Sequence, residues 1–238
     1  MNEDTTTPNP QQVQQIPQVS QMPAPDSISF IALGGLEDVT RNMYLYEYKN
    51  EILIVDCGLG FPDASMLGVD LLLPDITYLL DIIKTKRKKI VGMLLTHGHE
   101  DHIGGTPFIL PQLMPQGRTD VSFPIYASPL TAALTNAKLK EYNLPFVVKT
   151  VSFDDADVKI GPFTVSFIRV TPSVPDSATF FIYSPVGHFF HGIVFLLYMT
   201  PPDGTRSDSP NIHNPPWLVL LFLLSFFLLS VRSVLPPS

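Results

Sequence analysis

Hydrophobic and polar positions along residues 27–201 follow a pattern that predicts one packed domain of short strands and helices. Short apolar and β-branched runs bounded by turn residues predict strands at 28–33, 43–48, 52–55, 90–95, 124–127, 146–151, 158–160 and 163–170. Helical spacing of apolar residues predicts helices at 76–83 and 130–142, and a short helix that ends near Leu113. Because helices interrupt the strands, we expect an α/β fold in which helices cover sheets, and not a simple doubly wound sheet.

The chain on either side of this domain has a different composition. Residues 1–26 are rich in proline and glutamine and predict a disordered tail without a secretory signal peptide. Residues 202–216, rich in proline, aspartate, serine and asparagine, predict a linker. Residues 217–235 are mostly apolar, and as a helix they would reach about 28 Å, close to the ~30 Å of a bilayer core. This last segment is interpreted either as a membrane anchor or as an aberrant end.

Charge and cysteine content limit the classes of partner and the compartment. The 22 acidic and 15 basic residues give a net charge of −7, so the chain has no general electrostatic attraction to nucleic acid. The one basic run, residues 84–89, follows a predicted helix and is expected to be a solvated helix end. The single cysteine, Cys57, excludes an internal disulfide and fits a cytoplasmic location, with membrane anchoring as the alternative.

Four side chains that can bind metal ions lie directly after the predicted strand 90–95, namely His97, His99, Asp101 and His102. Imidazole and carboxylate groups bind a zinc-like ion at roughly 2.0–2.2 Å, and a turn at a strand end can aim several of them at one point. With one cysteine in the chain, a cysteine-based zinc site is excluded and the donors must be nitrogen and oxygen. The turn therefore predicts a metal site, and the alternative is a histidine-rich surface turn or hydrogen-bonded core histidines.

Further motifs along residues 28–204 narrow this interpretation. They are Leu33-Gly-Gly-Leu36, Asn42-Met-Tyr44, Val55-Asp-Cys-Gly-Leu59, Phe61-Pro-Asp63, Met66-Leu-Gly-Val-Asp70, Pro74-Asp-Ile76, Asn136-Ala-Lys-Leu-Lys140 and Ser173-Val-Pro-Asp-Ser177. With the His-x-His-x-Asp-His turn, the chain resembles the metallo-β-lactamase superfamily and, within it, the N-terminal part of bacterial ribonuclease J of the β-CASP group. The resemblance implies a metallo-β-lactamase-type αββα sandwich, incomplete because no β-CASP domain is present.

The resemblance also implies which residues hold metal. His97 and His99 would bind a first zinc ion, and Asp101 and His102 a second, with manganese as the alternative metal. Two ions roughly 3.5–4 Å apart would share a hydroxide for in-line attack on a phosphodiester.

Asp56 and Thr96 would brace the ligand turn from behind. The alternative interpretation of Asp56 is an ordinary hydrogen-bonded residue at a strand end.

Two positions depart from the family pattern. The family places a histidine ligand where this chain has Pro172, and a bridging aspartate where it has Val194. Without the shared carboxylate we expect one metal ion or none, and little or no hydrolysis. His188 and His191 could replace the missing ligands, but both lie in an apolar run.

Three functions remain open on the sequence alone. The first is a metal-dependent RNA hydrolase of ribonuclease J type, a 5′-exo- or endoribonuclease of RNA processing and decay, impaired here, with RNA as partner and a homo-oligomer allowed. The second is another hydrolase of the superfamily, acting on a small ester, thioester or lactam. The third is a non-catalytic remnant held at a membrane by residues 217–235.

Overall fold

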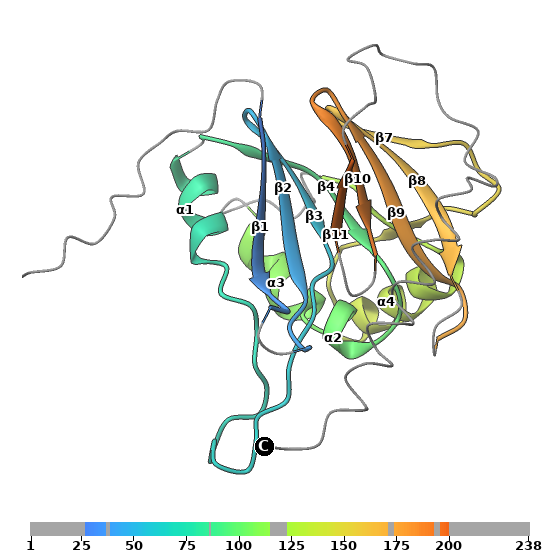
Figure 1. Ribbon diagram of the computed structural model, residues 1–238. Helices are drawn as coiled ribbons and strands as arrows, with labels where there is room; N and C mark the ends of the chain where they lie inside the picture. Colours follow the sequence, from blue (N-terminus) through green and yellow to red (C-terminus); the bar gives the residue numbers. More distant parts are fainter. Residues whose placement is uncertain are drawn as a thin grey trace, which may run out of the picture. The chain divides into compact units, whose positions relative to one another are not determined.

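The computed structural model of the protein describes residues 27–36, 39–85, 87–114, 123–170, 174–192 and the backbone of 196–199 (Figure 1). The predicted tail 1–26, linker 202–216 and apolar segment 217–235 lie outside the described residues, as do Pro172 and Val194. Among the described residues, no helix has the length and apolar character needed to cross a membrane.

The first sheet has strands in the order β1-β2-β3-β4-β5-β6. The first three strands pair antiparallel, whereas β3 to β6 pair in parallel. Their bounds are β1 (Ile28–Gly34), β2 (Met43–Tyr48), β3 (Glu51–Val55), β4 (Lys89–Leu95), β5 (Ile125–Ala127) and β6 (Val148–Thr150).

The second sheet is antiparallel throughout the described strands, in the order β11-β10-β9-β8-β7. Its strands are β7 (Val158–Ile160), β8 (Phe163–Val170), β9 (Ser177–Ser184), β10 (Gly187–His191) and β11 (Leu196–Met199).

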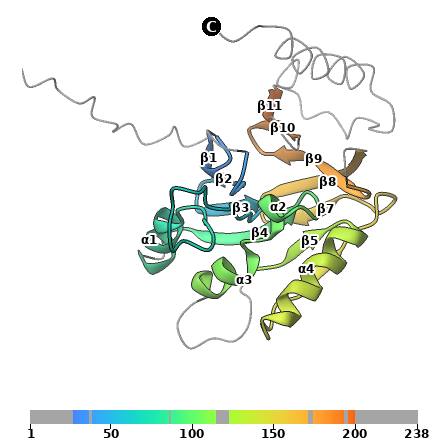
Figure 2. The same cartoon turned by 90° about the horizontal axis from the view of Figure 1, so that it is seen from below.

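Five short helices complete the described fold: α1 (Thr77–Thr85), α2 (Glu100–Ile103), α3 (Thr106–Ile109), the 3-10 helix η1 (Leu110–Leu113) and α4 (Pro129–Glu141). Helices α1, α3 and α4 lie on the face of the first sheet that points away from the second sheet (Figures 1 and 2). The layers are therefore helices, first sheet and second sheet, which confirms the expected α/β fold, with described helices covering the outer face of the first sheet.

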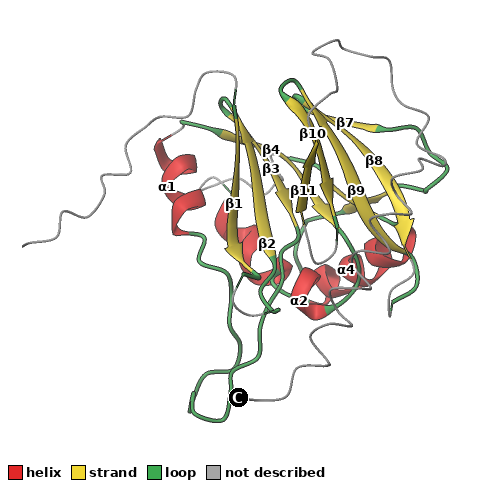
Figure 3. Ribbon diagram, in the orientation of Figure 1, coloured by secondary structure: helices red, strands yellow, loops and turns green. Residues whose placement is uncertain are grey.

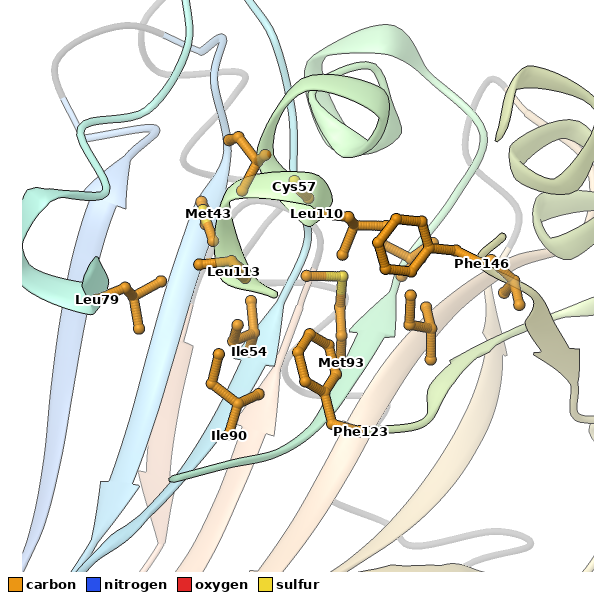
Figure 4. Packing of buried hydrophobic residues seen from close by; sticks show 14 of the residues in the cluster. Met43, Ile54, Cys57, Leu79, Ile90, Met93, Leu110, Leu113, Phe123 and Phe146 are labelled. Atoms are coloured by element: carbon orange, nitrogen blue, oxygen red, sulfur yellow. The ribbon is translucent and has the colours of Figure 1, made fainter. Parts of the chain in front are cut away.

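Strands β2 and β3 are buried on both faces because one face packs on helices and the other on the second sheet. Met43 and Ile54 belong to the cluster under the helices, whereas Tyr46 and Leu53 belong to the cluster between the two sheets. The sequence of a strand with two buried faces is an almost continuous run of apolar residues. Figure 4 shows the first cluster, in which strand side chains meet Leu79, Leu110, Leu113 and Phe146.

The strands β9 and β10 were not predicted from the sequence. All but the last two residues of β9 are buried, so the segment has no clean alternation of apolar and polar positions. Phe180 and Ile182 point into the cluster between the sheets, while Thr179 on the opposite face is also buried. A strand that is covered on both faces lacks the period-two signal by which a half-buried strand is found.

The basic run at residues 84–89 pairs with the chain's own carboxylates. Helix α1 ends at Thr85, Arg87 forms an ion pair with Asp81, and Lys89 Nζ lies 2.8 Å from Glu51 Oε1. Lys88 pairs with Glu47, whose side chain is 3% exposed. Three cations of this run, Arg87, Lys88 and Lys89, therefore have carboxylate partners within the fold.

Candidate metal centre

The parallel pairing of β3 and β4 brings their carboxyl ends to one edge of the first sheet (Figure 3). Asp56 follows β3, and Thr96 follows β4. The Asp56 N–H donates to the Leu94 carbonyl oxygen at 2.8 Å, which fixes the two strand ends side by side. The histidine turn begins directly after Thr96, so its side chains start from this edge.

Asp56 connects the two strand ends through a fully buried carboxylate. Its oxygens accept hydrogen bonds from the Thr96 N–H at 2.8 Å, the Thr96 hydroxyl at 2.8 Å and His102 Nδ1 at 2.7 Å. Asp56 has a φ of +62°, a left-handed conformation that aspartate tolerates better than most residues. The predicted bracing residues Asp56 and Thr96 thus lie behind the turn, and Asp56 fixes the orientation of the His102 ring.

The four predicted ligand residues lie together. His97 Nε2 is 3.0 Å from His99 Nδ1, and His102 Nε2 is 3.3 Å from Asp101 Oδ2. The ring centroids of His97 and His102 are 4.1 Å apart, and those of His97 and His99 are 4.7 Å apart. The turn is therefore not a set of side chains that point separately into solvent.

The spacing of these donors tests whether they fit a divalent ion. Two donors on one tetrahedral ion at about 2.1 Å lie about 3.4 Å apart. The separations of 3.0 Å between His97 and His99 and 3.3 Å between Asp101 and His102 are close to that value. Yet within the described ranges no group of three or more His, Cys, Asp or Glu side chains is placed to hold an ion. The residues therefore fit as two incomplete ligand pairs and not as a complete ion site.

The charges of the cluster are set by burial and by the two aspartates. Burial lowers the pKa of His102, but Asp56 and Asp101 outweigh it and raise that pKa to about 9. Burial and the neighbouring His102 lower the pKa of His97 to about 4. Burial opposes ionisation of Asp56, but His102 and the hydrogen bonds from Thr96 hold its pKa below the ordinary value. At neutral pH the metal-free cluster thus contains an ion pair, Asp56 with protonated His102.

This ion pair predicts a loss of stability at alkaline pH in the metal-free chain. The pKa of His102 is about 9 when folded and 6.5 when unfolded, so its contribution is complete below pH 6.5 and is lost as pH rises through 9. We expect the free energy of unfolding, measured by urea titration with chelator, to fall by about 2–3 kcal/mol between pH 7 and 10. His97 and His191 do not contribute in this window, since burial lowers both pKa values to about 4.

The control for this prediction is Asp56→Asn, which removes the charge that holds the His102 proton. Its unfolding free energy should change much less between pH 7 and 10. An equal fall in both chains would contradict the assignment of the effect to this pair.

Neither of the two histidines considered as replacement ligands joins the cluster through a described hydrogen bond. His191 is buried between the sheets, where its Nδ1 lies 2.8 Å from the Tyr46 hydroxyl. The ring of His188 lies against those of Phe181 and Tyr183, with centroids 5.9 and 5.1 Å away.

Several residues that contact the turn were not predicted from the sequence to have a role there. Lys138 on α4 donates to both carboxylate oxygens of Glu100 on α2, at 2.8 and 2.9 Å. Asn42, directly before β2, contacts both Asp101 and His102. Only a motif match could have drawn attention to Asn42 and Lys138, because they lie far from the turn in sequence.

The motif Ser173-Val-Pro-Asp-Ser177 has a structural role in its described part, residues 174–177. Asp176 accepts a hydrogen bond from the Leu130 N–H at 3.0 Å, which satisfies a free donor in the first turn of α4. Immediately afterwards, the Ala178 N–H donates to the Thr96 carbonyl oxygen at 2.8 Å. The start of β9 is therefore bonded to the residue that precedes the histidine turn.

Comparison with known proteins gives matches to one superfamily. A family model described as the metallo-beta-lactamase superfamily matches residues 36–183. Ribonuclease J of Thermus thermophilus is 39% identical over 191 residues, which are 79% of this chain and 32% of that protein. Ribonuclease J of Synechocystis is 40% identical over 202 residues, 84% of this chain and 30% of that protein.

The Corynebacterium glutamicum ribonuclease J is 38% identical over 200 residues, 84% of this chain and 26% of that protein. The chain thus spans about a third or less of the length of the curated relatives it matches.

Proposed function

The chain belongs to the metallo-beta-lactamase superfamily, and we propose that it is a ribonuclease J-type RNA hydrolase domain whose own metal site is incomplete. The observation that carries the proposal is the buried Asp56–His102 pair behind a turn that gathers His97, His99 and Asp101. The relatives named ribonuclease J support RNA as the substrate class, and this resemblance favours RNA over a small ester or lactam.

The superfamily implies use of a divalent metal ion, and we propose zinc, with manganese as the alternative. Nitrogen and oxygen donors without cysteine suit either ion. His97 and His99 would hold one ion, and Asp101 and His102 a second. A bound ion would supply a water of lowered pKa and stabilise charge on the phosphate oxygens. The chain's own contribution is to orient His102 through Asp56 and to keep its Nε2 directed at Asp101.

We further propose that Pro172 and Val194 limit this chain to one ion or none. Proline and valine carry no donor atom, so neither can complete a ligand pair or bridge two cations. The two pairs seen among the described residues are consistent with this limit. Low RNA hydrolysis by the unmodified chain follows from it.

Elemental analysis of the purified chain after incubation with Zn²⁺ or Mn²⁺ tests this proposal. We expect at most one ion per chain, and a smaller amount in the double variant His97→Ala/His99→Ala. With 5′-monophosphorylated RNA, release of nucleotides should not exceed that of the same variant. Two ions per chain would contradict the incomplete site, and turnover of a chromogenic lactam or thioester would contradict the RNA assignment.

Location and assembly also stay proposals. A single, buried cysteine fits a reducing compartment, and we propose the cytoplasm. Fractionation of expressing cells tests the alternative, since recovery with membranes would indicate an anchor in residues 217–235. Light scattering of the purified chain decides whether it forms a homo-oligomer.

A further inference from the structure

Asn42 lies where three loops of the site meet. Its backbone N–H donates to the Asp101 carbonyl oxygen at 3.0 Å, and its carbonyl oxygen accepts from the Gly58 N–H at 2.9 Å. The residue is only 5% exposed. Asn42 therefore joins the start of β2, the loop after β3 and the ligand turn through main-chain hydrogen bonds alone.

The side-chain amide of Asn42 makes a second connection to the same turn. Its Nδ2 donates at 3.0 Å to the Asp101 carbonyl oxygen and at 3.0 Å to that of Val39. The same nitrogen lies 3.4 Å from Asp101 Oδ2 and 3.3 Å from His102 Nε2. His102 Nδ1 donates to Asp56 at 2.7 Å and its Nε2 lies 3.3 Å from Asp101 Oδ2, so both protonated nitrogens of this imidazole face a carboxylate.

Tyr44 fixes the orientation of this amide. The Tyr44 hydroxyl donates to Asn42 Oδ1 at 2.8 Å, so the amide nitrogen must point at the turn. The Tyr44 ring is itself held, stacked on Phe30 at 5.8 Å and edge-on to His191 at 5.2 Å between centroids. The Asn42 carboxamide cannot flip its oxygen and nitrogen without losing the hydrogen bond from the Tyr44 hydroxyl.

Two glycines let the backbone approach the Asn42–Tyr44 pair and the turn closely. A Cβ on Gly58 would lie 1.7 Å from the Asp101 carbonyl oxygen, and a Cβ on Gly35 would lie 2.4 Å from both Asn42 Oδ1 and the Tyr44 hydroxyl oxygen. Gly35 also has a φ of +80°, which only glycine adopts readily. A side chain at either glycine would therefore displace the Asp101 main chain or the Asn42–Tyr44 pair.

We propose that Asn42, oriented by Tyr44, is a positioning residue that sets the placement of Asp101 beside the His102 Nε2 atom. Asn42 acts through Asp101, whose Oδ2 lies 3.3 Å from His102 Nε2, whereas Asp56 accepts from the other ring nitrogen. The effect of Asn42 on metal binding rests on the proposed function, whereas its effect on the His102 ring does not. Partners of this kind typically change metal affinity 10- to 100-fold when removed.

The test compares two single-hydroxyl deletions on the same strand. Tyr44→Phe removes the bond to Asn42, and Tyr46→Phe removes a bond of equal length, 2.8 Å, to His191. We expect Tyr44→Phe to weaken Co²⁺ binding about 10-fold in competition with a chelator, and to change the cobalt absorption bands. Tyr46→Phe should leave both unchanged, and the unfolding midpoints of the two variants should agree closely. Asn42→Ala should weaken binding further.

A metal-free measurement separates this inference from the proposed function. In chelator, the imidazole ¹⁵N resonance of His102 Nε2 should shift in Tyr44→Phe and not in Tyr46→Phe. If the unmodified chain binds no Co²⁺, the proposed limit of one ion or none still holds, and the ¹⁵N comparison alone decides the role of Asn42. Unchanged His102 resonances in Tyr44→Phe, or equal shifts in both variants, would overturn the inference.

Discussion

The double substitution Pro172→His and Val194→Asp is expected to raise the metal content to two ions per chain and RNA hydrolysis about a thousandfold. By the family resemblance, the first change would supply a third ligand to the His97–His99 pair, and the second a carboxylate that can bridge two ions and offset their repulsion. A metal-activated water and a doubly clamped phosphate are worth several kcal/mol of barrier, and about 4 kcal/mol corresponds to a thousandfold rate. Elemental analysis and release of nucleotides from 5′-monophosphorylated RNA measure the two effects.

The matched control for this experiment is Pro172→Ala with Val194→Asn. It makes the same backbone change at 172 and introduces a polar side chain at 194, without an imidazole or a charge. If the control gains as much metal or activity as the double variant, the gain does not come from the imidazole at 172 and the carboxylate at 194. A double variant with two ions but no RNA cleavage would contradict the substrate class alone.

Asp56→Ala is expected to destabilise the metal-free chain by about 3–5 kcal/mol at pH 7, because it removes the main ion-pair partner of the buried His102 imidazole. The substitution also removes the acceptors for the Thr96 N–H and hydroxyl at the end of β4. Alanine moreover tolerates the left-handed backbone at this position less well than aspartate does. Urea denaturation monitored by tyrosine fluorescence and circular dichroism measures the loss.

Asp56→Asn separates charge from shape in this experiment. Asparagine tolerates the same backbone conformation and keeps an oxygen that can accept from Thr96, so it should lose less stability than alanine. Ordinary point substitutions destabilise a protein by about 1 kcal/mol. If Asp56→Ala lowers the free energy of unfolding by less than that, the buried Asp56–His102 pair contributes little to stability.

The ligand turn could be predicted from the sequence because its chemistry is contiguous. His97, His99, Asp101 and His102 follow one apolar strand, and the structure places that strand at 89–95 as β4. The neighbouring strands were predicted for the same reason, since each is a local run with turn residues at its ends. The strands of the first sheet and the helices that cover it could therefore be predicted from the local pattern of apolar and polar residues.

The rest of the site depends on contacts between residues that are distant in the chain. Asn42 is 59 positions from Asp101, and Lys138 is 38 positions from Glu100. Neither residue belongs to a local pattern that predicts a metal site, and an asparagine before a strand is typical of an ordinary turn. Their roles arise from the tertiary fold, which the sequence pattern does not report.

The hydrogen bond from the Ala178 N–H to the Thr96 carbonyl oxygen has a consequence for biosynthesis. Every histidine of the turn is made before β9 leaves the ribosome, yet the residue that precedes them acquires this partner only afterwards. Long-range pairings of this kind form late, because the intervening chain must first be ordered. A nascent chain stalled before β9 would therefore expose the turn without its final support until synthesis had passed that strand.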